Sequence, residues 1–550
     1  MMKSKLLAIL LCAVLLISIA ACGGSSVPTT SEGGESPTGS APPATPSGGG
    51  ADTPDAPSTP DAPVSVTDTV NVAITADDGT LAAEYLMTGT YMAMSAVMEP
   101  LWDVTEANEV IMVLAESVEW IDDAHLTVHL RQGVKFSNGN PFTASDILFS
   151  LGLYKVAGMT GQPRVQTIDP EKTKVIDDHT LDLQLIAPSV AHWQILSQFF
   201  IYDEESYDQE KNSREPIGTG PYKLTEYIPN SSIKLERNEA YWGELPDIKN
   251  INFTLLAEPS QRVNALDTGL VDIAPIAIED VEYIESLPGV NLDSRFTQSY
   301  TMLGFNFGAK SAFYKNVDAR QAIIHAIDPQ VILDVVYLGQ GEVMHAAVPD
   351  ICFDYEDRFN DLVDTYAIGY DVELAKQLAQ SSGLAGQTIS LMTAGTSDAI
   401  KMAEIVQSMV SEIGVTVEIN NYDNAIAWQM AYDPESDYDF SIGVGIAPNR
   451  VVGDLLLNGV RYFPQLNVPG AFEGNMEYLE RAPLTMSTID EQERSELLYD
   501  LLRQYEENVI QHAMCNILVS NAYSTVIDPG SIVYSVGTGF VRLQDLKLAS

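Results

Sequence analysis

The folded part of the chain alternates between stretches with two different hydrophobic periods. In residues 120–130, and again in residues 176–185, an Asp-Asp pair precedes strict alternation of apolar and polar positions. Alternation with period two is typical of a strand with one buried face, and an Asp-Asp pair favours a turn. Each stretch therefore predicts a β-hairpin.

Other stretches combine helical apolar spacing with residues that begin helices. Residues 143–146, Thr-Ala-Ser-Asp, form a capping-box pattern that opens a helix. Asp318 is the predicted N-cap of a helix over residues 320–327. Asp328 followed by Pro329 predicts the start of the next helix, because proline fits the first helical position.

One region shows how helices and strands follow each other. Residues 400–413 have helical spacing, end at Gly414 and lead into an alternating strand at residues 415–419. A helix closed by glycine and followed by a strand is typical of an α/β layer. The fold class predicted from these patterns is α/β.

The first residues have the pattern of a bacterial export signal. Two lysines precede an apolar run that is shorter than the about 20 residues of a membrane-spanning helix. The small residues before Cys22 resemble a lipoprotein box, which predicts a signal peptide at residues 1–21 and lipid attachment at Cys22. Residues 22–67, rich in Gly, Ser, Thr and Pro, predict a disordered tether. The alternative is an ordinary signal peptide that contains a cysteine.

Composition limits the classes of protein. The residues after the tether are too many for one hydrophobic core, so at least two cores are expected. The net charge of −47 argues against nucleic acid and an anionic membrane surface as direct partners, because both would be repelled. Attraction of cationic ligands and a strongly solvated surface both remain open as explanations of the charge.

Cys352 and Cys515 either form a disulfide or stay as buried thiols. No spacing typical of a metal site occurs, so neither a metal nor a cofactor is expected.

A set of short motifs occurs in one order along the chain. The longest is LRQGVKFSNG at 130–139, continued by PFTASD at 141–146. The others are LAES at 114–117, GTGPY at 218–222, NEAYW at 238–242, RQAI at 320–323 and YD at 438–439. Together they resemble the peptide/nickel class (family 5) of extracellular solute-binding proteins of bacterial ABC importers. The glycines of GTGPY predict a tight turn before a strand, since the lysine and spacing of a phosphate loop are missing.

The resemblance implies a two-lobed, periplasmic-binding-protein-like fold of type II (Venus flytrap), with an extra subdomain inserted in lobe I. Lobe I is expected at residues 68–96, 215–305 and 521–550. The inserted subdomain is expected at residues 97–214, and lobe II at residues 306–520. The mechanism that the resemblance implies is hinge closure around a solute.

The resemblance also places ligand contacts after the YD strand. In peptide-binding members a tryptophan and an aspartate stand there, and the aspartate holds the amino group of the ligand; this chain has Ile446 and Asn449 instead. A neutral amide cannot make that charge-assisted bond, so Asp454 or another acid would have to replace it. Arg450 suits a carboxylate of the ligand through a bidentate contact, or is a surface residue. The predicted ligand-contacting residues are Tyr300, Asn306, Gly445, Ile446, Ala447, Asn449, Arg450 and Trp102.

Several of these residues also have a structural interpretation. Trp102, Tyr300 and Trp428 are candidates for a pocket wall, but such side chains lie more often in a hydrophobic core, and the core is favoured for Trp428. Tyr300 is favoured because it lies where the chain should cross between lobes. Asn306 either lines that crossing or satisfies backbone groups at the end of a strand.

These observations predict a substrate-binding lipoprotein, anchored on the outer face of the bacterial cytoplasmic membrane, that works as a monomer and catalyses no reaction. Its predicted ligand is an oligopeptide or peptide-like solute, and its partners are the permease and ATPase of an ABC importer. A receptor for a nickel chelate, an oligosaccharide or another small solute remains an alternative, as does a sensor without transport. No GxSxG, zinc motif or nucleophile–base arrangement favours an enzyme, although a pair of catalytic carboxylates stays open.

Overall fold

The computed structural model describes residues 68–549, apart from residues 88, 345, 366–368, 432, 434, 447–448, 463–470 and 537–538. The signal peptide, the lipid attachment at Cys22 and the tether therefore stay predictions, because they lie outside the described residues. The described part belongs to one compact unit, Ser65–Ser550. None of its helices is both long enough and apolar enough to cross a lipid bilayer.

A mixed sheet of eleven strands extends through the described residues. Ten of its strands follow one spatial order, and the short strand β13 pairs with β17 beside it. In spatial order the strands are β15 (Thr416–Tyr422), β14 (Thr388–Ala394), β16 (Phe440–Ile446), β12 (Val290–Phe305), β17 (Gln511–Ser524), β11 (Ile273–Ile276), β1 (Thr69–Ile74), β10 (Asn250–Leu255), β9 (Ser232–Arg237) and β8 (Tyr222–Ile228), with β13 at Gly341–Val343.

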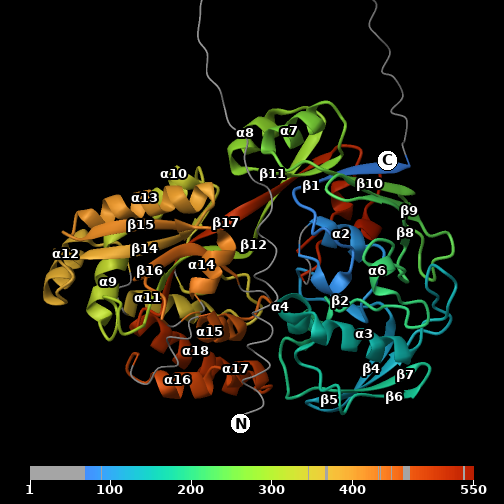
Figure 1. Cartoon of the computed structure of the whole chain (residues 1–550), viewed down its shortest axis with the longest axis horizontal. Coiled ribbons are helices and arrows are strands. Elements are labelled where there is room, and N and C mark those ends of the chain that lie inside the picture. Colours follow the sequence, from blue (N-terminus) through green and yellow to red (C-terminus); the bar gives the residue numbers. More distant parts are fainter. Residues whose placement is uncertain are drawn as a thin grey trace, which may run out of the picture. The chain divides into compact units, whose positions relative to one another are not determined.

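Two smaller sheets and the helices complete the described part (Figure 1). The smaller sheets are β2 (Trp102–Val104) with β3 (Val110–Met112), and β4 (Ala115–Asp122), β5 (His125–Leu130), β7 (Thr180–Gln184) and β6 (Lys174–Asp177) in that order. The helices are α2 (Gly89–Ser95), α3 (Ala144–Val156), α4 (Gly158–Gly161), α5 (His192–Leu196), α6 (Gln209–Asn212), α7 (Pro259–Asp267), α8 (Val281–Ser286), α9 (Val317–Ala326), α10 (Pro329–Val336), α11 (Asn360–Thr365), α12 (Val372–Ser381), α13 (Ser397–Ser411), α14 (Asn424–Ala431), α15 (Val452–Tyr462), α16 (Asn475–Arg481), α17 (Leu484–Ser487) and α18 (Glu491–Glu507).

Two large hydrophobic cores form, as the chain length leads one to expect. The first core joins side chains from the N-terminal strands, the four-stranded sheet and the C-terminal segment, among them Val72, Leu126, Phe253 and Leu543. The second core joins side chains from β12, β14, α9, α13 and α18, among them Phe305, Ile323, Leu391, Val406 and Leu501. The exact limits of the two lobes stay a prediction.

Strands β12 and β17 connect the two cores. They pair antiparallel from Val290, which lies opposite Ser524, to Gly304, which lies opposite Gln511. On the side of the first core β17 also pairs with β11. On the side of the second core β12 also pairs with β16. The pairing of β12 with β17 therefore reaches from one core to the other, with a shift of register between Phe296 and Tyr300 (Figure 1).

Both predicted hairpins are confirmed. β4 and β5 pair antiparallel with Trp120 opposite Leu126, and β6 and β7 pair with Val175 opposite Leu181. β5 also pairs with β7, so the two hairpins join into one sheet. The alternating apolar residues of β5 and β7 are buried in the first core, as period two requires.

Two of the three predicted helix starts are confirmed. The backbone N–H of Thr143 donates to the Asp146 carboxylate at 2.8 Å, and the Asp328 carboxylate accepts from the backbone N–H of Gln330 at 3.0 Å. The predicted cap at Asp318 is wrong. The helix α9 begins at Val317, and the side chain of Asn316 accepts from its first turn. Asn and Asp cap almost equally well, so residue type alone did not locate the cap.

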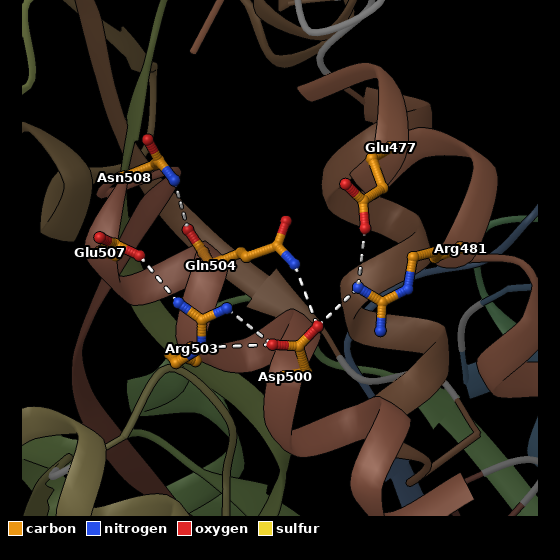
Figure 2. Close-up of polar contacts among 7 residues, drawn as sticks. All are labelled: Glu477, Arg481, Asp500, Arg503, Gln504, Glu507 and Asn508. Carbon is orange, nitrogen blue, oxygen red and sulfur yellow. Dashed lines mark hydrogen bonds and ion pairs between the residues drawn. The ribbon is translucent and has the colours of Figure 1, made fainter. Parts of the chain in front are cut away.

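Figure 2 shows the polar contacts that join α16 to α18. The Asp500 carboxylate accepts hydrogen bonds from Arg481 at 2.5 Å and from Arg503 at 2.7 Å. Partial burial raises the pKa of Asp500, but the hydrogen bonds and charges of both arginines outweigh it and hold that pKa below its usual value. The stabilisation is therefore present above the ordinary aspartate pKa and is lost as pH falls through the lowered one.

The glycines of the GTGPY motif act through close packing, which differs from the predicted tight turn. A Cβ on Gly218 would lie 2.0 Å from the Val97 carbonyl oxygen, and one on Gly220 would lie 2.6 Å from the Ala96 carbonyl oxygen. The backbone N–H of Gly220 donates to the Val97 carbonyl at 2.9 Å. The two segments touch backbone to backbone, which only glycine permits.

This contact predicts opposite effects for two Gly→Ala substitutions. Gly218→Ala should lower the free energy of unfolding by about 3 kcal/mol, because backbone atoms must move to admit the methyl group. Gly152→Ala is the control, since Gly152 is exposed within α3 and nothing lies within 4 Å of its Cβ position. It should raise stability by up to about 1 kcal/mol through helix propensity. Urea unfolding of both variants measures the difference, and equal effects would contradict the packing explanation.

Candidate functional site

The pairing of β12 with β17 is irregular where the strands pass between the cores. Phe296 lies opposite Leu518, whereas Tyr300 lies opposite Asn516. Three residues of β12 thus face one residue of β17, which is a bulge, and a bulge bends and twists a strand. At this point β12 begins to pair with β16, with Ser299 opposite Ile446.

The predicted residues Tyr300, Gly445 and Ile446 meet beside this bulge. Tyr300 lies opposite Gly445 in the register of β12 and β16. The Tyr300 side chain is buried, and burial raises its pKa, so the phenol keeps its proton at neutral pH. For Gly445 and Ile446 the structure describes the strand backbone, whereas Ala447 lies outside the described residues.

Asn516, which the sequence analysis did not single out, lies opposite Tyr300 on β17. Its side chain is 1% exposed, and neither polar atom of its amide has a hydrogen-bond partner among the described residues. An unsatisfied buried amide is costly, and such groups recur at functional sites. No local pattern marks Asn516, because its surroundings depend on the register of two distant strands.

Asn306 satisfies backbone groups at the end of a strand, which was one of the two alternatives predicted for it. Its side-chain N–H donates to the carbonyl of Tyr438 at 2.7 Å, and its side-chain oxygen accepts from the backbone N–H of Gly308 at 2.8 Å. These bonds fix the chain where β12 ends beside the start of β16.

Asn449 and Arg450 lie between β16 and α15 and are both buried. The Asn449 amide donates to the Asp454 carboxylate at 2.8 Å, so these two side chains hold each other. Arg450 has a positive φ of 50°, and its carbonyl accepts from the backbone N–H of Phe353 at 2.8 Å. Such a backbone is uncommon for a non-glycine residue and occurs where surrounding contacts enforce it.

Arg450 contacts a carboxylate of the chain itself. Its terminal nitrogen donates to Glu106 at 2.7 Å, and its Nε has no partner among the described residues. The same oxygen of Glu106 accepts from Arg295 of β12. Arg295 also lies over the ring of Tyr534, 3.3 Å from its centre. Glu106 thus links the loop after β2 to the crossing strand and to the loop before α15.

Trp102 lies in the first core. It is fully buried, its indole N–H donates to the Trp193 carbonyl at 3.1 Å, and the two indole rings meet edge to face with centres 4.7 Å apart. The side chain of Trp428, on α14, lies outside the described part. Trp102 is therefore not brought together with Tyr300 and Arg450 by any contact among the described residues.

Cys352 and Cys515 are free thiols, and both are buried. Of the two arrangements that the sequence left open, the structure has the unpaired one. Burial raises the pKa of Cys515 to about 11, and it raises the pKa of Cys352 above its ordinary value. Both thiols therefore stay protonated at neutral pH.

Comparison with known sequences agrees with the motifs. Residues 109–451 match the bacterial extracellular solute-binding proteins, family 5 Middle. Because this match covers more than half of the chain, the chain belongs to that family, whose members are binding proteins of the extracellular or periplasmic side.

The matches to curated relatives cover only part of each protein. The dipeptide-binding protein of Escherichia coli (strain K12) is 28% identical over 350 residues, which are 58% of this chain and 64% of the relative. The oligopeptide-binding protein AppA of Bacillus subtilis (strain 168) is 24% identical over 362 residues, which are 61% of this chain and 65% of the relative. The chain thus spans slightly less than two thirds of the length of these relatives.

Solved structures share the fold. The substrate-binding protein CtaP of Listeria monocytogenes superposes with a TM-score of 0.74 at 19% identity, over 87% of this chain and 99% of that protein. NikA of Brucella suis in complex with Fe(III)-EDTA gives a TM-score of 0.74 at 21% identity, over 88% of this chain and all of NikA. The predicted two-lobed fold of type II is confirmed.

The amide of Asn516 leads to a stability prediction. Asn516→Leu should raise the free energy of unfolding of the ligand-free protein by about 1 kcal/mol, because an unsatisfied buried amide is removed. Asn306→Leu is the matched control, since its amide is equally buried but hydrogen-bonded, and it should lower stability by about 2 kcal/mol. Urea unfolding distinguishes the two. Destabilisation of similar size in both variants would mean that Asn516 has partners in solution.

Proposed function

We propose that this chain is the solute-binding lipoprotein of an ABC importer and that it captures an oligopeptide or peptide-like solute. Membership of family 5 is the observation that carries the proposal, supported by relatives named as dipeptide- and oligopeptide-binding proteins. The protein acts as a monomer, catalyses no reaction and delivers its ligand to a permease and ATPase complex. Cys22 carries the lipid that holds it on the outer face of the membrane.

We assign the hinge between the two lobes to the bulge in β12. Arg295 lies in β12 before the bulge, where β12 pairs with the half of β17 that continues toward β11. Arg450 follows β16 in the chain, where Val451 is buried in the first core and Val452 in the second. In this proposal the pair Glu106–Arg295 stays together when the hinge moves, whereas the pair Glu106–Arg450 forms only in the closed protein. A contact made in one state alone shifts the population toward that state.

The ligand lies beside Tyr300, Asn516 and Arg450 in this proposal. Within the described part of the chain, the Nε of Arg450 and both atoms of the Asn516 amide lack a hydrogen-bond partner. An arginine donor and an amide suit the C-terminal carboxylate and the backbone of a peptide. Asp354 has a buried carboxylate oxygen without a hydrogen-bond partner among the described residues, and it is the acid assigned here to the amino group of the ligand.

Ligand screening tests the class of solute. A pool of dipeptides to hexapeptides should raise the melting temperature, because a ligand at about 100 times its Kd adds about 2.7 kcal/mol to the stability of the folded state. Nickel chelates and oligosaccharides at the same concentration should leave it unchanged. A shift with a sugar or a chelate, and none with any peptide, would replace the peptide assignment by one of these alternatives.

Arg450 is tested with a pair of peptides that differ only at the C-terminus. Arg450→Ala should weaken a bound peptide with a free carboxylate about tenfold, or about 1.4 kcal/mol, and the amidated peptide much less. Calorimetric titration of both peptides with both proteins gives the coupling between Arg450 and the carboxylate. If both peptides are weakened equally, Arg450 does not bind the carboxylate and acts only through its contact with Glu106. If neither affinity changes, Arg450 is not part of the ligand site.

A further inference from the structure

A cavity of about 780 Å³ opens at the surface beside the first core, separate from the proposed ligand site, and some of its lining residues, among them Glu244 and Lys547, are exposed. None of its described lining residues belongs to β12, β16 or β17. Its walls come from residues 95–113, residues 241–247 and the C-terminal residues 528–547, with three single residues between them. A volume between about 300 and 1,000 Å³ is typical of small-molecule sites.

The charges around this cavity are unbalanced. Its lining holds two cations, Arg542 and Lys547. It holds six carboxyl groups, which are those of Glu99, Asp103, Glu244, Asp247, Asp528 and Asp545. Arg542 is already bound by two of them, because it donates to Asp103 and, at 2.5 Å, to Asp545. The lining therefore has a deficit of positive charge.

Glu99 differs from the other carboxyl groups of this lining. It is buried, with 5% of its surface exposed, and it has no direct cationic partner among the described residues. It accepts from the Tyr241 hydroxyl at 2.7 Å and from the Trp242 indole N–H at 2.9 Å. The Thr219 hydroxyl also faces it, and the charge of Arg542 acts on it more weakly. Burial outweighs these groups and raises the pKa of Glu99 to about 7.

Aromatic side chains form part of the same wall. Tyr241 and Trp242, which donate to Glu99, line the cavity together with Phe200 and Phe540. The Arg131 guanidinium lies 5.2 Å from the centre of the Trp242 ring, so this ring already attracts one cation. Carboxylates next to aromatic rings are the surroundings in which proteins hold organic cations, because both attract positive charge.

We propose that this cavity is a second binding site, which takes a small organic ammonium ion with an aromatic or aliphatic body. The ammonium group pairs with Glu99, and the body of the ion packs against Tyr241 and Trp242. This site is independent of the proposed solute site, so either proposal can fail while the other stands.

Calorimetric titration of the full chain with phenethylammonium tests the proposal. Binding should be about tenfold tighter near pH 8 than near pH 6, because the ionised fraction of a carboxyl group with a pKa of about 7 rises about tenfold over this interval. Near pH 6 the ion should also displace a proton, which appears as a binding enthalpy that depends on the ionisation enthalpy of the buffer. The neutral analogue 2-phenylethanol should bind more weakly and without proton release.

Two variants locate the effect. Glu99→Gln should weaken phenethylammonium at least tenfold near pH 8 and abolish the pH dependence. Glu412→Gln is the control, because Glu412 is an exposed carboxylate at the end of α13, outside the cavity, and it should change neither. The proposal is overturned if the unsubstituted protein releases no proton on binding, if 2-phenylethanol binds as tightly as the ion, or if a folded Glu99→Gln protein keeps the original affinity. The first two measurements need no variant, so poor folding of Glu99→Gln would not prevent the test.

Discussion

The antiparallel pairing of β12 with β17 is the contact on which the rest of the structure depends. Each core has its own strands, and this pair joins them, because β17 also pairs with β11 on the side of the first core and β12 also pairs with β16 on the side of the second. Tyr523 of β17 is buried in the first core and Cys515 of the same strand in the second. A regular ladder would couple the cores rigidly, since its hydrogen bonds resist bending along the strands. The bulge before Tyr300 interrupts the ladder between them, and this is where a bend is least costly.

The interruption also explains why polar side chains gather at the crossing. The bulge changes the register beside Asn516, and the side-chain amide of Asn516 is buried there with no hydrogen-bond partner among the described residues. Natural proteins keep few such groups, because each costs about 1–3 kcal/mol. A bound solute that satisfies the amide would recover this free energy. In the proposed function, the bulge thus provides both the hinge between the lobes and a place where the solute binds.

Buried arginines connect distant segments in a chain that has few cations. Arg320 donates to the carbonyls of Asn508 and Phe313, and Arg164 donates to those of Ala83 and Leu86. These arginines are held by backbone acceptors, which fix geometry without a counter-charge. The arginines around Glu106 differ, because two of them share one carboxylate. The net charge of −47 makes such clusters of positive charge rare, and the proposed function assigns the acidic group of the ligand to this cluster.

The sequence by itself determined the features that depend on neighbours along the chain. The two hairpins, the capping box at Thr143 and the start of α10 follow from local periods and turn residues, and the ordered motifs determined the family and with it the fold. Only the tertiary structure decided which distant groups meet. Glu106 is 189 residues from Arg295 and 344 from Arg450, and no local pattern encodes such contacts. The glycines at 218 and 220 show the same limit, because the motif marked them correctly while the reason, contact with the backbone near Val97, required the fold.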